Sequence, residues 1–220
     1  MSPSSSDPSG RCFIVGAGPV DPDPPTPGPG DYVIAADGGY AATQRWGWVT
    51  DLVVGDFDSI EQPIGENLIV CPVAKDDTDL LVAFRAGWDR GYRQFHLLGA
   101  SGGRFDHTLA NLQTLAAIAG AGGQGFLFGS TTVVTALHQG RLSFAAGARG
   151  TISVFAHSDQ ASGVDESGLL YSLDDATLDN TYPRGVSNAF TGRPSQVSVR
   201  RGTLIVVFPR AVPLPTFDPW

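Results

Sequence analysis

The chain has 220 residues, enough for one large domain or two small ones, and 42% of them are hydrophobic, as in a globular protein. Its formal net charge of −8 and its pI of about 4.7 exclude general binding to nucleic acids or anionic membranes, which requires clustered lysine and arginine. No apolar run reaches the roughly 18 residues of a membrane span, and residues 1–10 lack the features of a secretory signal, so we expect a cytoplasmic protein.

The first part of the chain alternates apolar runs with helical patterns. Residues 1–10 are rich in Ser, Pro and Gly and are predicted to be a disordered tail, and the prolines of 21–30 predict a surface loop because they lack N–H groups. Short apolar runs predict strands at 12–15, 32–36, 52–54, 68–73 and 95–98. Apolar spacing of three and four predicts helices at 40–46, 79–90 and 107–119. This alternation is typical of an α/β fold with an N-terminal, Rossmann-like, mostly parallel sheet covered by helices.

The pattern changes after the glycine-rich residues 120–125. No helical spacing follows, and apolar or Thr-rich runs predict strands at 131–137, 141–145, 151–156, 196–200 and 203–208. We therefore expect a C-terminal antiparallel β-sandwich domain. The predicted division is a tail at 1–10, an α/β nucleotide-binding domain at 11–129 and a β-sandwich at 130–220, with 124–128 able to complete the first sheet.

Two cysteines, Cys12 and Cys71, lie far apart and outside any C-x-x-C spacing. Each is interpreted as a small buried hydrophobic residue beside a strand. We therefore expect no disulfide between them.

Aspartates and glycines follow the predicted strands of the first domain. Asp56 and Asp58 lie in GDFDS, and Asp79 ends KDDTD, which also contains Lys75. Asp37 begins the run DGG. Ligands bind beyond the carboxyl ends of strands in open α/β sheets, and carboxylates are the hard oxygen ligands that Mg²⁺ prefers. These motifs together predict a site for Mg²⁺ and a nucleotide, although each alone also fits a turn or a helix cap.

A further motif, GGRFDH, precedes the third predicted helix. It combines flexible backbone with Arg104, Asp106 and His107, and Arg104 could hold a phosphate through two hydrogen bonds. A glycine turn capped by Asp106 is the alternative interpretation. The run Gly16-Ala17-Gly18 is an incomplete dinucleotide fingerprint, since Asp21 stands where a third glycine would be and a proline loop follows.

Read in order, these motifs resemble those of the thiamine pyrophosphokinase family. The matching runs are ADGG, GDFDSI, KDDTDL, GASGGRFDHTLANL, GLLYSL and GVSNAF, and they extend over about residues 33–208. The resemblance implies an α/β nucleotide domain followed by a β-sandwich, and a homodimer with thiamine bound between the two chains. It also implies transfer of a pyrophosphoryl group from ATP to the hydroxyethyl oxygen of thiamine, with release of AMP and with Mg²⁺ as cofactor.

The same resemblance implies a role for each motif. Asp56 and Asp58 would hold Mg²⁺, with Asp79 as a further ligand or neighbour of the ligands. Asp106 would contact the reacting groups or the thiamine, and either Asp79 or Asp106 would accept the substrate proton. The nucleotide would be framed by Asp37, Gly38, Gly39, Lys75, Gly102, Gly103, Arg104, His107 and Asn111. Substrate contacts are implied for Ser187, Asn188 and Phe190, with Phe190 offering an aromatic face to the cationic substrate.

The sequence departs from this pattern at two positions. Leu81 and Ala189 stand where bacterial relatives often have glutamate. The loss of acidic groups beside the substrate leaves two alternatives open. One is a pyrophosphokinase for another alcohol, such as a hydroxymethyl pterin. The other is a non-catalytic regulator that binds thiamine or a nucleotide.

Overall fold

A computed structural model describes residues 9–20, 22–55 and 77–220 and the backbone of 68–70. It divides into two compact units. The first unit comprises residues 1–114 and 127–129, and the second comprises 115–126 and 130–220. The predicted site residues Asp56, Asp58 and Lys75 lie outside the described residues, as does Cys71. The predicted boundary between 129 and 130 stays a prediction.

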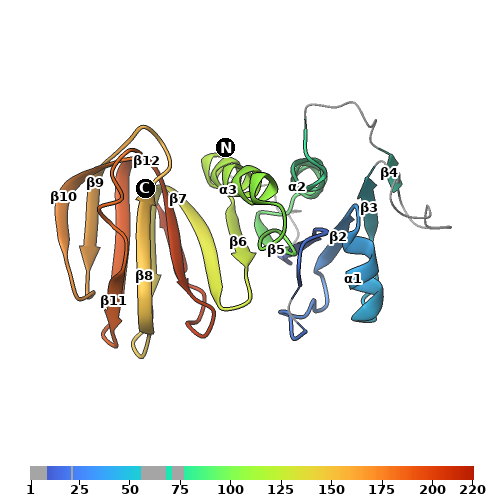
Figure 1. The fold of residues 1–220 in the computed structure, drawn as a ribbon, viewed down its shortest axis with the longest axis horizontal. Coiled ribbons are helices and arrows are strands. Elements are labelled where there is room, and N and C mark those ends of the chain that lie inside the picture. The colour runs from blue at the N-terminus through green and yellow to red at the C-terminus, as the bar shows by residue number, and fades with distance from the viewer. Residues whose placement is uncertain (1–8, 21, 56–67, 71–76) are drawn as a thin grey trace. The chain divides into compact units, whose positions relative to one another are not determined.

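The first unit contains a parallel sheet with the strand order β5-β1-β2-β3-β4 (Figure 1). These strands are β1 (Cys12–Val15), β2 (Tyr32–Ala36), β3 (Leu52–Gly55), β4 (Leu68–Val70) and β5 (Gln94–Leu98). Every residue of β1 is buried, which explains why its sequence is continuously apolar rather than alternating. The predicted strands at 12–15 and 32–36 are confirmed to the residue. The mixed α/β character expected from the sequence is also confirmed.

Helices connect these strands. They are α1 (Gly39–Arg45), α2 (Asp79–Asp89) and α3 (Phe105–Gly120). The Thr78 side chain caps α2 by accepting a hydrogen bond of 3.3 Å from the Leu81 N–H. Helix α3 begins two residues before its predicted start. Its first turn contains Asp106, which suits the positive end of the helix dipole.

Close backbone contact positions α1 against the sheet. A Cβ atom added to Gly39, the first residue of α1, would lie 1.8 Å from the carbonyl oxygen of Val15. The end of β1 and the start of α1 can therefore touch only through glycine. Behind this contact, Phe13 and Val33 belong to a buried cluster on which Trp46 and Trp48 pack.

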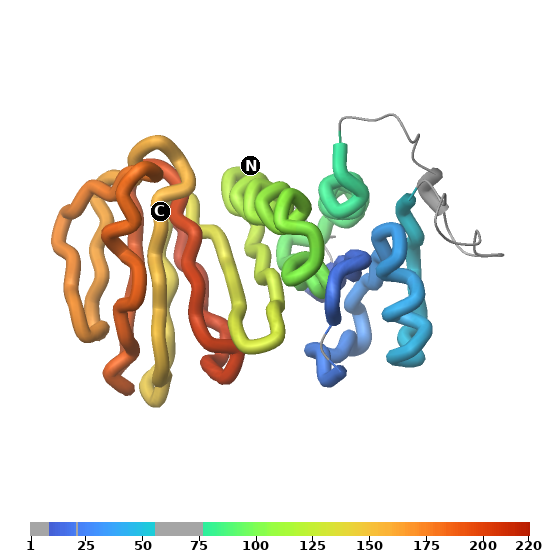
Figure 2. Tube along the Cα trace, viewed as in Figure 1, coloured from blue at the N-terminus to red at the C-terminus, as the bar shows by residue number. Residues whose placement is uncertain are grey.

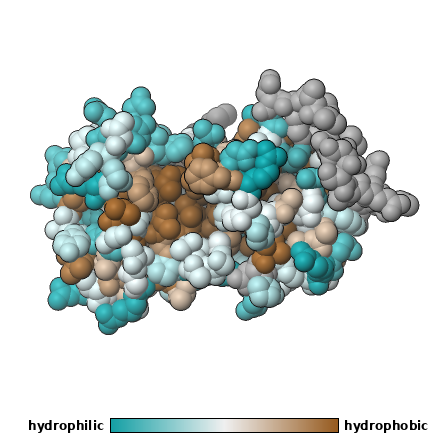
Figure 3. All heavy atoms as spheres, viewed as in Figure 1, coloured by the Kyte–Doolittle hydropathy of each residue, from teal (hydrophilic) through white to brown (hydrophobic). Residues whose placement is uncertain are grey.

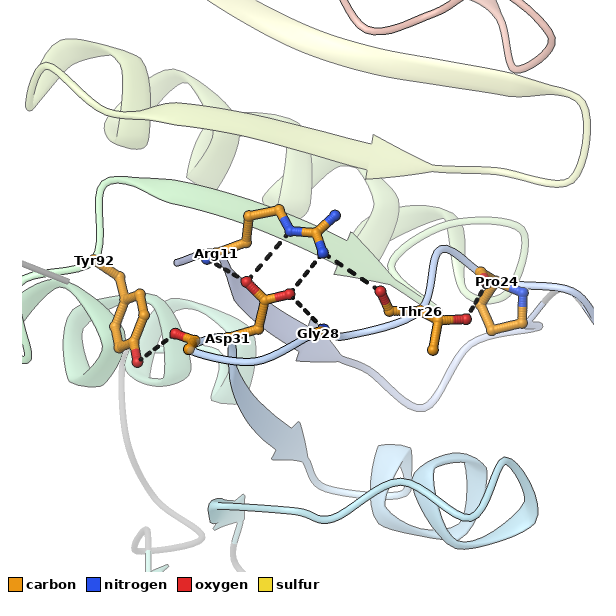
Figure 4. A network of polar contacts seen from close by, with 7 residues as sticks. Arg11, Pro24, Thr26, Gly28, Asp31 and Tyr92 are labelled. Atoms are coloured by element: carbon orange, nitrogen blue, oxygen red, sulfur yellow. Dashed lines mark hydrogen bonds and ion pairs between the residues drawn. The ribbon is translucent and has the colours of Figure 1, made fainter. Parts of the chain in front are cut away.

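The proline loop is held by one ion-paired network. The Asp31 carboxylate accepts hydrogen bonds from the Arg11 N–H and Arg11 Nη2, both at 2.6 Å, and from the Gly28 N–H at 2.8 Å (Figure 4). Arg11 Nη2 also donates to the Thr26 carbonyl at 3.4 Å. Burial raises the pKa of Asp31, but its bonds to Arg11 and Gly28 outweigh this effect, so the pKa lies below its ordinary value. The loop is thus tied to the start of β1.

All strand pairs within the second unit are antiparallel (Figures 1 and 2). Its strands are β7 (Thr132–Phe144), β8 (Arg149–Ala156), β9 (Gln160–Ser167), β10 (Leu173–Asp179), β11 (Asn188–Thr191), β12 (Ser195–Pro209) and β13 (Thr216–Pro219). Strand β6 (Gln124–Phe128) precedes them, and these are the residues that the sequence analysis treated as a possible last strand of the first sheet. Four of these strands, β9, β10, β11 and β13, were not predicted.

Two of the predicted breaks between strands are wrong. Residues 131–137 and 141–145 form the single strand β7, and 196–200 and 203–208 form the single strand β12. The polar residues that suggested turns instead form irregularities within the pairing, where the register shifts between Val199 and Thr203. There the His138 Nδ1 atom lies 2.8 Å from the Thr203 hydroxyl, so the two strands stay joined across the irregularity.

Hydrophobic side chains reach the surface over β8 and its neighbouring strands on the face shown in Figure 3. Elsewhere in this unit Leu170 and Tyr171 are 60% and 66% exposed. Within the part of the chain that the structure describes, no helix has the length and apolar character needed to cross a membrane.

Candidate active site

A cavity of about 510 Å³ lies in the first unit beyond the carboxyl ends of the parallel strands. Segments that follow β1, β2 and β5 line it, together with the first residues of α2 and the first two turns of α3. The lining residues are Gly16, Ala17, Gly18, Pro19, Ala36, Asp37, Asp77, Thr78, Asp79, Leu80, Gly99, Ala100, Ser101, Gly103, Arg104, His107, Thr108 and Asn111. This is the edge of an open α/β sheet at which ligands bind.

Asp37 occupies a special position in the cavity wall. Its φ of 49° is in the left-handed region, which aspartate tolerates better than most residues with a side chain. Its N–H donates to the Val54 carbonyl at 2.7 Å, and this bond fixes the turn that leaves β2. The Oδ1 atom of Asp37 is buried and has no hydrogen-bond partner among the described residues. A buried carboxylate oxygen without a partner is costly, so this atom is suited to receive a ligand.

The loops after β1 and β5 pack together through their backbones. Gly16 and Gly18 donate to the carbonyl oxygens of Leu98 and Gly99 at 2.8 and 2.9 Å. A Cβ atom on Gly18 would lie 2.6 Å from the Gly99 oxygen. Gly16 and Gly18 belong to the incomplete dinucleotide fingerprint described above. In the structure these two glycines allow two loops to pack closely at the cavity.

Asn111 connects helix α3 to this wall. Its side chain is buried, and its Nδ2 atom donates to the Ala100 carbonyl at 2.7 Å. This bond fixes the angle at which α3 leaves the loop after β5. The predicted neighbour of the nucleotide thus lines the cavity and also has a structural function.

Arg104 and Asp106 form an exposed ion pair at the start of α3. The Arg104 Nε and Nη2 atoms donate to the two carboxylate oxygens of Asp106 at 3.2 and 2.6 Å. This hydrogen bond to Arg104 lowers the pKa of Asp106 to about 2. Arg104 and His107 line the cavity, whereas Asp106 is outside its lining.

The start of α2 contributes acidic groups. Asp79 and Asp77 both line the cavity, and Asp77 is paired with Arg85 of the same helix. The predicted residues Asp37, Asp79, Gly103, Arg104, His107 and Asn111 are therefore brought together in one cavity. Gly38, Gly39 and Gly102 adjoin the lining residues in sequence and are not themselves part of the lining.

Hydroxyl groups of Ser101 and Thr108 also line the cavity, and neither residue was proposed from the sequence as a site residue. The signal was present, because Ser101 follows a predicted strand and Thr108 lies one helical turn after Arg104. The Thr108 hydroxyl donates to the Arg104 carbonyl at 3.2 Å.

The predicted substrate residues lie in the second unit and form no part of this cavity. Ser187 is exposed, has a left-handed φ of 62°, and donates its N–H to the Ser153 hydroxyl at 3.0 Å. Asn188 is buried, and Phe190 is buried with its ring 5.0 Å from that of Phe144. Contact of these three residues with a substrate stays a prediction.

The donors in the cavity fit a divalent cation that is shared with phosphate. Mg²⁺ is usually held by one or two carboxylates together with phosphate oxygens and water. The carboxylates of Asp37 and Asp79 both line the cavity and are of this kind, and the buried Oδ1 atom of Asp37 has no hydrogen-bond partner in the part of the chain that the structure describes. Among residues 9–20, 22–55 and 77–220, no three His, Cys, Asp or Glu side chains cluster as a complete metal site.

Comparison with known proteins agrees with this geometry. Residues 29–122 match the family model described as the catalytic domain of thiamin pyrophosphokinase. A thiamin pyrophosphokinase family protein from Enterococcus faecalis has a similar structure, with a TM-score of 0.77 and 26% identity, over 91% of this chain and 99% of that one. Residues 29–122 are therefore similar in sequence to the catalytic domain of thiamin pyrophosphokinases, and the chain as a whole has a fold like that of the Enterococcus faecalis protein.

Thiamine pyrophosphokinases of lower sequence identity share the fold. The enzyme from Bacillus subtilis aligns with a TM-score of 0.80 at 20% identity, over 92% of this chain and all of the other. The thiamin pyrophosphokinase of Candida albicans aligns with a TM-score of 0.71 at 15% identity, over 95% and 94% of the two chains. No curated protein sequence matches this chain. The family match includes the cavity residues from Ala36 to Asn111.

Proposed function

We propose that this protein is a thiamine pyrophosphokinase. It transfers a pyrophosphoryl group from ATP to the hydroxyethyl oxygen of thiamine and gives thiamine diphosphate and AMP. The observation that carries this proposal is the cavity at the carboxyl edge of the sheet, where the family-matched segment supplies the Asp37 carboxylate, whose Oδ1 atom has no partner among the described residues.

The cavity supplies the parts that a polyphosphate requires. Arg104 offers two parallel N–H donors, which can pass from Asp106 to a phosphate without a change in their own geometry. The first turn of α3 adds backbone N–H groups and the positive end of a helix dipole. Gly38, Gly39, Gly102 and Gly103 complete the nucleotide-binding frame in this proposal, with Lys75 as a further cation.

Mg²⁺ would be held by Asp56, Asp58 and Asp79, and Asp37 lines the same cavity as Asp79. When bound, Mg²⁺ would neutralise charge on the phosphate oxygens. The chain's own contribution is to hold the nucleotide and the alcohol in line, because pyrophosphoryl transfer depends on positioning and charge neutralisation more than on a strong base.

Proton transfer at the alcohol is assigned to Asp79 or Asp106. Asp106 is a weak base while Arg104 holds its pKa near 2. Movement of Arg104 to a phosphate would remove this hydrogen bond and raise the pKa of Asp106. Nucleotide binding would then release Asp106 to contact the substrate hydroxyl.

The remaining features of the proposal concern the architecture. The first unit acts as a Rossmann-like nucleotide domain and the second as a β-sandwich that contributes Ser187, Asn188 and Phe190 to the thiamine pocket. The active form is a cytoplasmic homodimer with this pocket at the subunit interface. The antiparallel pairing in the second unit supports its assignment as a sandwich.

The test is AMP release from Mg·ATP by the purified protein, with and without thiamine. Thiamine-dependent AMP with an equal amount of thiamine diphosphate is the expected result. AMP release with a hydroxymethyl pterin in place of thiamine would retain the phosphate site and overturn the substrate. Tight thiamine binding without AMP from any alcohol would instead indicate a regulator.

The metal assignment has its own test. Asp56→Asn and Asp58→Asn should each abolish turnover at saturating Mg²⁺ while the thermal unfolding curve stays cooperative. Near-wild-type turnover in both variants would rule out these two carboxylates as ligands.

A further inference from the structure

A buried glutamate lies beside the predicted substrate residues and has no role in the proposal above. Glu166 belongs to β9 in the second unit and is 2% exposed. Its Oε2 atom accepts a hydrogen bond of 2.8 Å from the Asn188 side chain, 22 residues away in the sequence. Its Oε1 atom is buried and has no hydrogen-bond partner among the described residues. A carboxyl group buried at such cost requires an explanation.

The Asn188 amide is fully used within the chain. Its second Nδ2 hydrogen is donated to the Tyr171 carbonyl at 2.7 Å. Its Oδ1 atom accepts from the N–H groups of Tyr171 and Ala189 at 3.0 and 2.8 Å. One side chain therefore holds both backbone polar groups of Tyr171, and an asparagine amide has two hydrogens and one oxygen to offer.

This arrangement works in only one orientation of the amide. Rotation of the Asn188 amide by half a turn would place its oxygen against the Tyr171 carbonyl and its NH₂ group against the Tyr171 N–H. An ionised carboxylate only accepts hydrogen bonds, so Glu166 requires the NH₂ group to face it. Glu166 thereby selects the orientation in which Asn188 binds Tyr171.

The residues held in this way belong to an exposed segment. Tyr171 is 66% exposed and Leu170 is 60% exposed, although the backbone beneath them is tied to β11. The Leu170 N–H donates to the Ala189 carbonyl at 2.9 Å, and Leu169 forms a bridge with Phe190. Leu170 and Tyr171 are thus exposed to solvent on a backbone that is bonded to β11, while Leu169 is buried.

We infer that Glu166 is a positioning residue for thiamine binding. It fixes the Asn188 amide, and through it the segment 169–171 beside the substrate residues 187–190. This inference rests on the proposed function. It predicts that Glu166 affects the affinity for the alcohol substrate, while the nucleotide cavity in the first unit and its affinity for ATP stay unchanged.

The experiment compares Glu166→Leu, Glu166→Gln and the control Asp165→Asn. Leucine fills a similar volume but accepts no hydrogen bond, whereas the glutamine oxygen can still accept from Asn188. Asp165 is the neighbouring carboxylate on β9, and it accepts from the Asp175 N–H at 2.8 Å instead. Two quantities are measured for each protein: hydrogen exchange at the Tyr171 amide, and KM for thiamine and for ATP together with kcat.

Glu166→Leu should speed exchange at Tyr171 about tenfold and raise KM for thiamine by a similar factor, since an acceptor is lost from a buried donor. KM for ATP should stay within about twofold. Glu166→Gln and Asp165→Asn should both resemble the wild type. Unchanged Tyr171 exchange in Glu166→Leu, or equal increases of KM for thiamine and ATP, would overturn the inference.

Two further observations keep this test decisive. If Glu166→Leu does not unfold cooperatively, Glu166→Met is measured in its place, because methionine also removes the carboxylate acceptor while Asn188 stays intact. It should give the same rise in Tyr171 exchange, and unchanged exchange would overturn the inference. Absence of thiamine-dependent turnover in the wild type would refute the proposed function. Tyr171 exchange would then decide separately whether Glu166 orients Asn188.

Discussion

Replacement of Asp37 by asparagine should separate stability from activity. The Oδ1 atom of Asp37 is buried and has no hydrogen-bond partner within residues 9–20, 22–55 and 77–220, and an unsatisfied buried polar group costs about 1–3 kcal/mol, or more if charged. Asparagine tolerates the left-handed φ of 49° at this position as well as aspartate does. Removal of the charge should therefore raise the free energy of unfolding by about 1 kcal/mol, since an amide is less costly to bury than a carboxylate.

The same substitution should reduce turnover. If Asp37 faces Mg²⁺ or a phosphate-bound water, loss of its charge should lower kcat at least about a hundredfold, which corresponds to about 2.7 kcal/mol of transition-state stabilisation. Urea unfolding followed by tryptophan fluorescence measures the stability, and thiamine-dependent AMP release measures the turnover. Both are determined on the same preparation.

Asp31→Asn is the matched control. Asp31 is also a carboxylate of the first unit, but it accepts three hydrogen bonds of 2.6 to 2.8 Å from Arg11 and Gly28. Its replacement should lower the free energy of unfolding by about 1.5–3 kcal/mol, the range for hydrogen bonds to charged groups. If Asp37→Asn destabilises the protein as much as Asp31→Asn does, the Asp37 oxygen is not unsatisfied and the reasoning is refuted. Full turnover in Asp37→Asn would refute its place in the site.

Three other predictions concern single groups. Arg104→Ala should raise KM for ATP about tenfold, as steady-state kinetics can measure. Because the ion pair of Arg104 with Asp106 is exposed, the free energy of unfolding should change by less than about 0.5 kcal/mol. A large loss of stability in urea unfolding would contradict this prediction. Burial raises the pKa of Glu166 above 4.5, against the smaller opposing effects of Asn188 and Arg184, so the folded state binds more protons than the unfolded state. Stability should consequently fall as the pH rises above about 4.5 in the wild type and less so in Glu166→Gln, and parallel slopes between pH 5 and 8 would argue against this. Burial raises the pKa of Cys12 well above its ordinary value, so a disulfide reagent should label Cys12 only in denaturant, as peptide mapping can verify.

The sequence predicted the elements whose burial is uniform. Strands β1 and β2 are continuous apolar runs because helices and loops cover both faces of a parallel sheet, and α2 begins next to a threonine cap. Strand β10 was not predicted because its sequence, LDDATLD, is acidic and only one of its residues is buried. Backbone pairing with β9 rather than burial keeps it extended. Strands β11 and β13, with four residues each, are too short for a periodic signal.

The candidate site was predictable to the level of motifs. Asp37, Asp79, Arg104 and Asn111 share a cavity because each follows a parallel strand or lies at or within the first two turns of a helix at the same sheet edge. Their individual states were not predictable. That Arg104 is engaged by Asp106 depends on side-chain geometry, and the bond from Asn188 to Glu166 joins residues 22 positions apart on separate strands.

The contact between Gly39 and Val15 limits how this sequence can vary during evolution. With a Cβ atom only 1.8 Å from the Val15 oxygen, even alanine would push α1 away from β1 and move the Asp37 turn that precedes it. Position 39 should therefore admit a single amino acid in a saturation library. Gly47, where an added Cβ would meet no atom within 4 Å and φ is +68°, should also accept asparagine or aspartate. Tolerance at these two glycines thus differs because one meets a carbonyl group and the other meets solvent.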